Sequence, residues 1–339
     1  MSQDLKKLPA ESFNRVQVDS SQAEKISKPS VSFWKDAWYR IRKNKAAIVS
    51  VFILLIILVM SLIGPHIGPH DAETQTITHA NLPPKVPGIE KLGIMDGYGN
   101  LAGKEVDLYE LKKVDTYYWF GTDGLGRDMF ARVWEGTQVS LFIAFMAALI
   151  DMVIGVAYGG ISGYYGGRVD DVMQRIVEIL IGIPNLVIVI LMIMFMDPGI
   201  TAIIIAITIT GWIGMSRVVR AQVLKYKNQE FVLAARTLGA SNNRIITKHI
   251  LPNVLSIVVI NTMFTIPSAI FFEAFLSFIG LGLQPPAASL GTLINDGVKL
   301  LKFQPHILVY PAVIISLLML SFNLLGDGLR DALDPKMKD

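Results

Sequence analysis

The chain has 339 residues, of which 52% are hydrophobic and 17% charged, and its net charge is +3 at neutral pH. Soluble domains contain about 25% charged residues, so this deficit indicates a membrane protein. The small net charge argues against nucleic-acid binding. Because the sequence contains no cysteine, disulfides, zinc–thiolate sites and thiol nucleophiles are excluded.

The amino-terminal part predicts a tail, a surface helix and a first membrane span. Residues 1–32 are polar and lack periodicity, so we expect a disordered cytoplasmic tail. Residues 33–45 predict an amphipathic helix at the inner membrane surface, although an extension of the first span is the alternative. Its apolar stripe is Phe33, Trp34, Ala37, Trp38 and Ile41, and its basic face holds Lys35, Arg40, Arg42 and Lys43.

Residues 46–63 are uncharged and form the first predicted transmembrane helix, since about 20 residues cross a hydrocarbon core of about 30 Å. The basic residues before it place the amino terminus in the cytoplasm. Residues 64–137 are then extracytoplasmic. Their prolines and mixed charges predict a small folded unit, and loops longer than about 60 residues translocate largely regardless of charge.

The run GTDGLGRD from Gly121 to Asp128 lacks the spacing of a phosphate-binding loop and the oxygen ligands of a calcium loop. We expect a turn-rich segment in which Arg127 and Asp128 pair with each other or with a partner chain. A metal site at His66, His70 and Asp71 is disfavoured, because the intervening prolines and glycine predict a turn.

Five further apolar segments complete an all-α polytopic membrane protein with six transmembrane helices and both termini in the cytoplasm. The segments are 138–159, 176–196, 200–215, 254–279 and 307–325. Basic residues in the loops between the second and third and between the fourth and fifth segments agree with this orientation. Residues 138–326 therefore form a membrane core, and 327–339 a cytoplasmic tail.

Two carboxylates interrupt the apolar segments, and charges within a membrane are costly. Asp151 falls in the middle of the second span, where it should face protein or water. Glu273 follows Pro267 in the fifth span. Both are candidates for lining a pathway, and for Glu273 pairing between helices is an equal alternative.

A polar, basic segment at 229–252, QEFVLAARTLGASNNRIITKHILP, lies in the predicted cytoplasmic loop 217–252. We expect a helix with Ala234, Ala235 and Leu238 on one face. Gly239 is suited to end that helix and Ser241 to cap the next one. The pattern predicts a helix–turn–helix that docks on another protein, against the alternative of an ordinary surface loop.

This segment resembles the cytoplasmic "EAA" loop of bacterial ABC importer permeases. The similarity continues, in family order, in FGTDGLGRDMFARVWEGTQVSL at 120–141, EAFLSFIGLGL at 273–283 and GDGLRDALDPK at 326–336. The chain is thereby identified with the dipeptide/oligopeptide/nickel permease family, and it is most similar to the C-type subunit of oligopeptide permeases. One departure is Leu233, which stands where the broad motif has a glutamate.

The resemblance implies a type I ABC importer permease in the bacterial plasma membrane that carries oligopeptides. Its implied partners are a second homologous permease, two cytoplasmic ATP-binding subunits and an extracellular peptide-binding protein. The chain itself would be no enzyme and bind no cofactor or metal, because ATP and magnesium belong to the ATPase subunits. Alternatives are a same-family permease for dipeptides, nickel, a metal chelate or glutathione, and an ATPase-independent secondary transporter.

The resemblance also assigns the ATPase-coupling residues. They are Glu230, Ala234, Ala235, Arg236, Gly239, Leu251 and Pro252. Because of the Leu233 departure, the charge contact with the ATPase is open between Glu230 and Arg236. Asp151 and Glu273 remain the candidates for the pathway.

Overall fold

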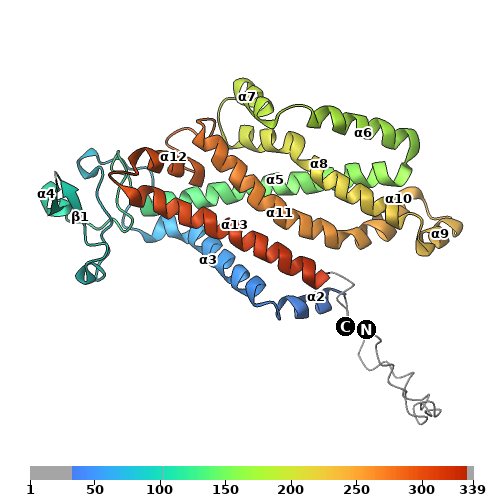
Figure 1. Cartoon of the computed structure of the whole chain (residues 1–339), viewed down its shortest axis with the longest axis horizontal. Coiled ribbons are helices and arrows are strands. Elements are labelled where there is room, and N and C mark those ends of the chain that lie inside the picture. Colours follow the sequence, from blue (N-terminus) through green and yellow to red (C-terminus); the bar gives the residue numbers. More distant parts are fainter. Residues whose placement is uncertain (1–32, 102, 334–339) are drawn as a thin grey trace, which may run out of the picture.

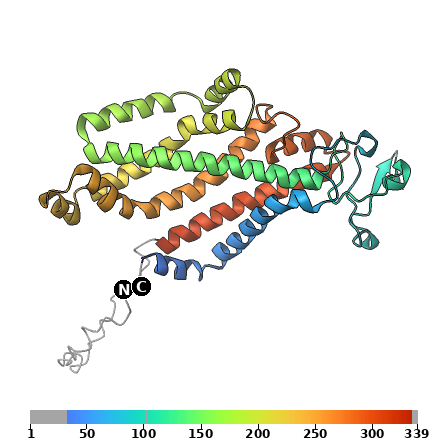
Figure 2. The ribbon, with the colours of Figure 1, turned by 180° about the vertical axis from the view of Figure 1, so that it is seen from behind.

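The computed structural model describes residues 33–101 and 103–333. The helices form an elongated bundle with a small loop module at one end (Figure 1). Five helices are long and apolar enough to cross a membrane, and a bent pair makes a sixth span if it is counted as one. Figure 2 shows the same bundle from behind, with the long helix α5 running through its length.

Two helices open the described chain. Helix α2 (Phe33–Ile41) ends four residues earlier than the predicted amphipathic segment, because Asn44 starts a new helix by accepting a hydrogen bond from the Ala47 backbone N–H. Helix α3 (Lys45–Ile67) is the first span and packs beside α13 (Pro305–Leu333). The predicted tail at 1–32 lies outside the described residues.

Residues 68–128 form the loop module, which is folded as predicted. It contains two short 3₁₀ turns (Ile77–His79 and Glu90–Leu92), the antiparallel hairpin β1 (Tyr98–Leu101) and β2 (Lys104–Asp107), and α4 (Leu108–Lys112). Its small core consists of Leu82, Tyr109, Val114 and Tyr118.

The predicted loop region ends at residue 137, but the helix that follows it starts earlier. Helix α5 (Met129–Tyr165) begins directly after Asp128, whose carboxylate caps it by accepting hydrogen bonds from the Phe130 and Ala131 N–H groups. The first turns of α5 contain Arg132 and Glu135, so hydrophobicity alone did not place them in a span.

Helices α5 and α8 (Ile200–Tyr226) make the most extensive contact in the bundle. Three glycines of α5 at a four-residue spacing allow it. A Cβ on Gly155 would lie 2.6 Å from Met215 Cβ, and one on Gly163 would lie 2.9 Å from the Arg220 carbonyl oxygen. A Cβ on Gly159 would overlap the Ser216 carbonyl. Small residues let membrane helices approach closely, which maximises their packing.

The third predicted span, 176–196, is not one helix. Its residues belong to α6 (Gly167–Ile181) and α7 (Asn185–Met196), which meet at 81°. Pro184 has no N–H to continue a helix and disfavours helical geometry at the preceding residue, so the chain breaks there. In Figure 1 the two helices lie along the α8 side of the bundle.

The carboxyl-terminal half continues with α9 (Glu230–Thr237), α10 (Asn242–Arg244), a π-helical stretch (Ile245–Ile250) and α11 (Leu251–Phe278). Helix α12 (Leu290–Leu300), which was not predicted, precedes α13. Helix α13 continues into the predicted cytoplasmic tail at 327–339 and stays helical to Leu333. Its Gly328 lies against Ala47 of α3, where a Cβ would come within 2.6 Å of the Ala47 Cβ.

The outward faces of the spans are apolar. Phe52 and Leu62 of α3 are 63% and 53% exposed, whereas Ile57 packs inward with Trp134, Ile270 and Leu318 of neighbouring helices. A bundle that buries one apolar face and exposes another is suited to a lipid environment, where the exposed side chains need no shielding from water.

Candidate functional site

The segment 229–252 has the helix–turn–helix form that its sequence predicts. Gly239 adopts the left-handed conformation with φ of 79°. Around it, the Gly239 N–H bonds to the Arg236 carbonyl and the Ala240 N–H to the Ala235 carbonyl, both at 3.0 Å, which closes the end of α9. The Ser241 hydroxyl then accepts a hydrogen bond from the Arg244 N–H and starts α10.

The faces of α9 differ from the prediction. Val232 and Ala235 point inward, and Val232 packs with Ile245 and Ile250 of the π-helical stretch. Ala234 is exposed, and Leu238 is 87% exposed. The prediction that Ala234, Ala235 and Leu238 share one face was therefore wrong. The buried side of α9 is formed by Val232 and Ala235, which are three residues apart.

Helix α9 presents an apolar edge away from the bundle. Phe231 and Leu238, which share one side of the helix, are 42% and 87% exposed, and Leu233 on another side is 47% exposed. Helix α9 lies at the far end of the molecule from the loop module (Figure 1). Glu230 is exposed in the first turn of α9, where its charge is favoured by the helix dipole. An exposed apolar edge of this kind is typical of a protein-docking surface.

One tyrosine ties this segment to α5. The Tyr164 hydroxyl donates to Asn242 Oδ1 over 2.8 Å, and the Arg236 guanidinium lies 5.9 Å from the centre of the Tyr164 ring. Tyr164 is buried in the same apolar cluster as Val232. Arg236 is thus engaged with α5, whereas Glu230 remains at the surface.

The second half of the segment is continuous with a membrane helix. Residues Asn242–Phe278 form 37 consecutive helical residues, so α10, the π-helical stretch and α11 are one unit. Leu251 and Pro252 lie in the first turn of α11, within this unit rather than at the end of a loop. Helix α9 contacts this unit through Val232, which packs with Ile245 and Ile250, and it contacts α5 through Arg236, which lies against the Tyr164 ring.

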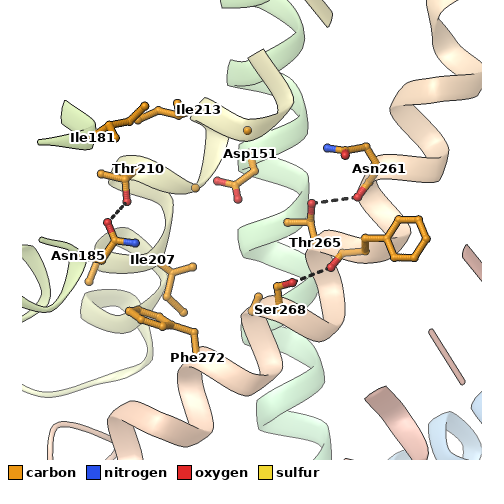
Figure 3. A pocket seen from close by; sticks show the side chains of 15 residues that line it. Asp151, Ile181, Asn185, Ile207, Thr210, Ile213, Asn261, Thr265, Ser268 and Phe272 are labelled. Atoms are coloured by element: carbon orange, nitrogen blue, oxygen red, sulfur yellow. Dashed lines mark hydrogen bonds between the residues drawn. The ribbon is translucent and has the colours of Figure 1, made fainter. Parts of the chain in front are cut away.

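A polar cleft of about 640 Å³ lies among α5, α7, α8 and α11 (Figure 3). Within it, Thr210 donates to Asn185 Oδ1 over 2.9 Å, which joins α8 to α7. On the other side of the cleft, the Thr265 hydroxyl donates a hydrogen bond to the Asn261 backbone carbonyl of the same helix, over 3.1 Å. The cleft thus has polar walls inside a bundle of mainly apolar helices.

Asp151 of α5 lies between the two walls of the cleft (Figure 3). It is 3% exposed, and its Oδ1 has no hydrogen-bond partner within the described residues. Gly211 of α8 lies opposite, and a Cβ there would overlap the carboxylate. This position inside the bundle agrees with the prediction that Asp151 faces protein or water rather than lipid.

Glu273 lies elsewhere. It is fully buried and accepts hydrogen bonds from Ser140 of α5 at 2.9 Å and from Ser277 at 2.8 Å. Ser140 Oγ in turn accepts from the Leu290 N–H at the start of α12. Glu273 therefore connects α11, α5 and α12, as expected if it pairs helices with one another. It is not among the residues that line the cleft.

At the opposite end of α5, the predicted pairing of Arg127 with Asp128 was wrong. Arg127 Nε contacts Asp123 Oδ2 at 2.7 Å, four residues earlier, while Asp128 caps α5. Burial raises the pKa of Asp128 to about 6, against its two backbone hydrogen bonds, which lower it. Within residues 33–101 and 103–333, no group of three or more histidine or acidic side chains is placed to hold a metal ion.

Several site residues were not singled out from the sequence. They are Tyr164, Asn185, Thr210, Gly211, Asn242, Asn261 and Thr265. The asparagines and threonines inside apolar segments are a weak signal, because a hydroxyl can bond to its own helix, as Thr265 does. The Tyr164–Asn242 contact joins positions 78 residues apart and leaves no local pattern.

The chain is similar to known membrane components of transport systems. Residues 155–339 match the family described as binding-protein-dependent transport system inner membrane component, and residues 32–84 match the N-terminal TM domain of oligopeptide transport permease C.

Curated relatives match nearly the whole chain. Identity is 46% to the dipeptide transport system permease protein DppC of Bacillus subtilis (98% of this chain, 94% of the relative). It is 43% to the oligopeptide transport system permease protein OppC of the same organism (98% and 100%). The OppC of Escherichia coli is 37% identical (93% and 95%).

Among solved structures, a chain of the MetNI methionine ABC transporter in inward-facing conformations aligns with a TM-score of 0.51. It is 20% identical and covers 61% of this chain and 98% of that chain. This likeness shows that the fold of the helical core is shared.

Proposed function

The chain belongs to the family of binding-protein-dependent transport system inner membrane components, as a permease of the peptide ABC importers, and we propose that its substrates are oligopeptides. It forms half of a membrane pathway with a second, homologous permease. An extracellular binding protein delivers the peptide, and two cytoplasmic subunits hydrolyse ATP. The chain itself binds no cofactor, and both of its termini are cytoplasmic.

The observation that carries this proposal is the exposed apolar edge of α9 together with its two rigid connections. Leu238 and Phe231 offer a surface for a cleft of the ATPase subunit. The continuous helix from Asn242 to Phe278 and the Tyr164–Asn242 hydrogen bond connect that surface to the spans. Closure of the ATPase pair would move α9, and α5 and α11 would reorient around the cleft.

The cleft around Asp151 is the proposed part of the pathway contributed by this chain. Its walls combine amide and hydroxyl groups with apolar side chains, so they can hydrogen-bond a peptide backbone without selecting one sequence. The Asp151 carboxylate supplies one acceptor with a free oxygen, suited to an ammonium or amide donor of the peptide.

Dipeptides are the second candidate substrate. The relative named as a dipeptide permease is 46% identical and the one named as an oligopeptide permease is 43% identical. Sequence identity therefore does not distinguish the two substrates. The matched N-terminal TM domain of oligopeptide transport permease C favours the longer substrates. Uptake of a length series of labelled peptides by the complete importer distinguishes the two candidates.

The coupling surface is tested by Leu238→Asp in the complete importer, reconstituted with its partner permease, ATPase subunits and binding protein. We expect assembly or substrate-stimulated ATP hydrolysis to fall by at least about tenfold, because a charge in a packed interface centre costs on the order of 2 kcal/mol or more. The variant should still insert normally, since Leu238 is 87% exposed.

Leu92→Asp is the matched control, because Leu92 is 76% exposed and lies in the loop module, far from α9. It should leave ATPase assembly intact. If Leu238→Asp assembles and hydrolyses ATP in response to peptide like the unmodified importer, α9 is not the coupling surface.

A further inference from the structure

A second polar pocket, of about 220 Å³, lies where the start of α5, the segment after α11 and helix α12 meet. It is at the end of the bundle that carries the loop module, and it shares no lining residue with the cleft around Asp151. Its polar lining includes Arg127, Arg132, Gln284, Asn295, Asp296 and Lys299.

Two buried guanidinium groups of this pocket share one carboxylate. Arg127 and Arg132 are only 5% and 3% exposed. Asp123 Oδ2 lies 2.7 Å from Arg127 Nε and 3.6 Å from Arg132 Nε. The other oxygen of Asp123 is occupied by the backbone N–H groups of Leu125 and Arg127. Among the ion pairs within 4 Å, the two guanidinium groups therefore have one carboxylate between them.

Two further carboxylates, Asp296 at the rim and Glu135 of α5, also attract Arg132 over a longer distance. Asp296 lies 3.3 Å from Lys299, and both side chains are more than half exposed, so this pair is neutral and solvated. A buried charge without a partner is strongly unfavourable, whereas a charge-assisted hydrogen bond to it is favourable. An anion that reached an unbonded N–H group of Arg127 would gain such a hydrogen bond.

One donor of the two arginines has no partner in the described part of the chain. Arg127 Nη1 is buried and makes no hydrogen bond within the described residues, whereas Arg132 Nε faces Asp123 Oδ2 at 3.6 Å. Arg132 Nη1 donates to the Ala72 carbonyl at 3.2 Å, which fixes the side chain in place. A planar guanidinium with unused N–H groups matches the geometry of a carboxylate.

We propose that this pocket binds a carboxylate presented from outside the membrane, namely the α-carboxylate of the arriving peptide. Its volume holds one amino-acid-sized group, since a water molecule occupies about 30 Å³ of liquid. The amide side chains of Gln284 and Asn295 also line the pocket, and Asn295 Nδ2 donates to the Ser277 carbonyl over 3.4 Å. The assignment rests on the proposed function for its peptide substrate and its outward orientation.

A single substitution at a lining residue can place a side chain of this protein in the pocket. Ala287 lines it and is exposed, so Ala287→Glu introduces a tethered carboxylate and Ala287→Gln an uncharged side chain of the same size. The difference between these two variants isolates charge from volume. Neither substitution touches the Asp123–Arg127 ion pair, so folding is preserved in both.

The experiment measures uptake of one peptide with a free carboxyl terminus and of its carboxyl-terminal amide by the complete importer in proteoliposomes. All samples use the same binding protein, so its own preference cancels in the comparison. We expect Ala287→Glu to lower the free-acid to amide uptake ratio by at least about tenfold relative to Ala287→Gln, which corresponds to about 1.4 kcal/mol.

A second arm measures the affinity of the peptide-free binding protein for each variant. If Ala287→Glu weakens this affinity about tenfold relative to Ala287→Gln and leaves the uptake ratio unchanged, the carboxylate belongs to an acidic side chain of the binding protein. Carboxylate recognition then stands and the peptide terminus is ruled out as its source.

Equal behaviour of the two variants in both arms overturns the proposal. That result differs from a failure of the proposed function, in which the unmodified importer would take up neither peptide. Lys299→Gln provides a further check, because Lys299 is an exposed rim residue and its loss removes positive charge without disturbing the buried arginines. It should lower the uptake ratio in the same direction as Ala287→Glu.

Discussion

At the residue scale, the position of Asp151 depends on a glycine of the neighbouring helix. The carboxylate is held between α5 and α8 where Gly211 has no side chain, and Asp151 Oδ1 has no hydrogen-bond partner within the described residues. An unpartnered buried polar group is costly, so its retention in the wall of a cleft is consistent with a functional role.

We therefore expect Gly211→Ala to displace the Asp151 carboxylate and to lower both the melting temperature of the purified importer and its rate of peptide uptake. Overpacking of this kind costs about 1–3 kcal/mol. Adding Asp151→Ala should restore much of the melting temperature, because the small side chain frees the space that the new methyl group needs.

Gly160→Ala is the control for that substitution. Gly160 is on α5, and a Cβ there meets no atom within 4 Å. It should leave stability unchanged or raise it slightly, since alanine favours helix more than glycine by about 1 kcal/mol. Additive losses from Gly211→Ala and Asp151→Ala would show that the two positions are not coupled.

The sequence predicted the role of a residue when that role depends on its immediate neighbours along the chain. Asp151 stood out because a charge interrupts an apolar segment. Gly211 did not, because its role is set by a side chain 60 positions away. Gly239 was predicted correctly, since a left-handed residue at the end of a short helix is a local requirement.

At the scale of elements, the connection between α9 and the membrane helices passes through one hydrogen bond and one continuous helix. Tyr164 of α5 and Asn242 of α10 are buried together with apolar residues of α9 and α11. The hydrogen bond fixes the orientation of the turn at Gly239 relative to α5. Without it, α9 would remain folded but its motion would reach α5 less directly.

We expect Tyr164→Phe to raise the number of ATP molecules hydrolysed per peptide transported. The lost hydrogen bond is worth about 1 kcal/mol, so the change should be several-fold rather than complete. Tyr165→Phe is the matched control, because Tyr165 is the adjacent tyrosine and is 53% exposed. In a double-mutant cycle, Asn242→Ala should add nothing further to Tyr164→Phe, and an additive effect would contradict the direct contact.

The prediction of elements succeeded for long apolar runs and failed where helices bend or are short. The signal for the break at Pro184 was present, but the surrounding residues are uniformly apolar and hide it in a hydropathy profile. Helix α12 has only 11 residues, so its length excluded it as a span. The helical continuation of α13 to Leu333 depends on packing of Gly328 against Ala47, which no local pattern reveals.

At the scale of the whole molecule, the loop module and α9 lie at opposite ends of the bundle (Figure 1). This separation is what an importer needs, with delivery of substrate at one end and energy input at the other. The number of candidate spans and their order followed from hydropathy, whereas the cleft between α5, α7, α8 and α11 required their packing. The basic residues of the loops predict that the α9 end faces the cytoplasm.

The orientation is testable because the chain contains no cysteine, so each introduced cysteine is the sole labelling site. Leu92→Cys in the loop module and Leu238→Cys at the end of α9 replace leucines that are 76% and 87% exposed, so neither disturbs a packed core. In intact cells that express the permease without its partners, a membrane-impermeant maleimide should label Leu92→Cys. It should label Leu238→Cys only after permeabilisation, because a charged reagent does not cross the hydrocarbon core. Labelling of Leu238→Cys in intact cells would invert the orientation and place the apolar edge of α9 beyond the reach of any ATPase.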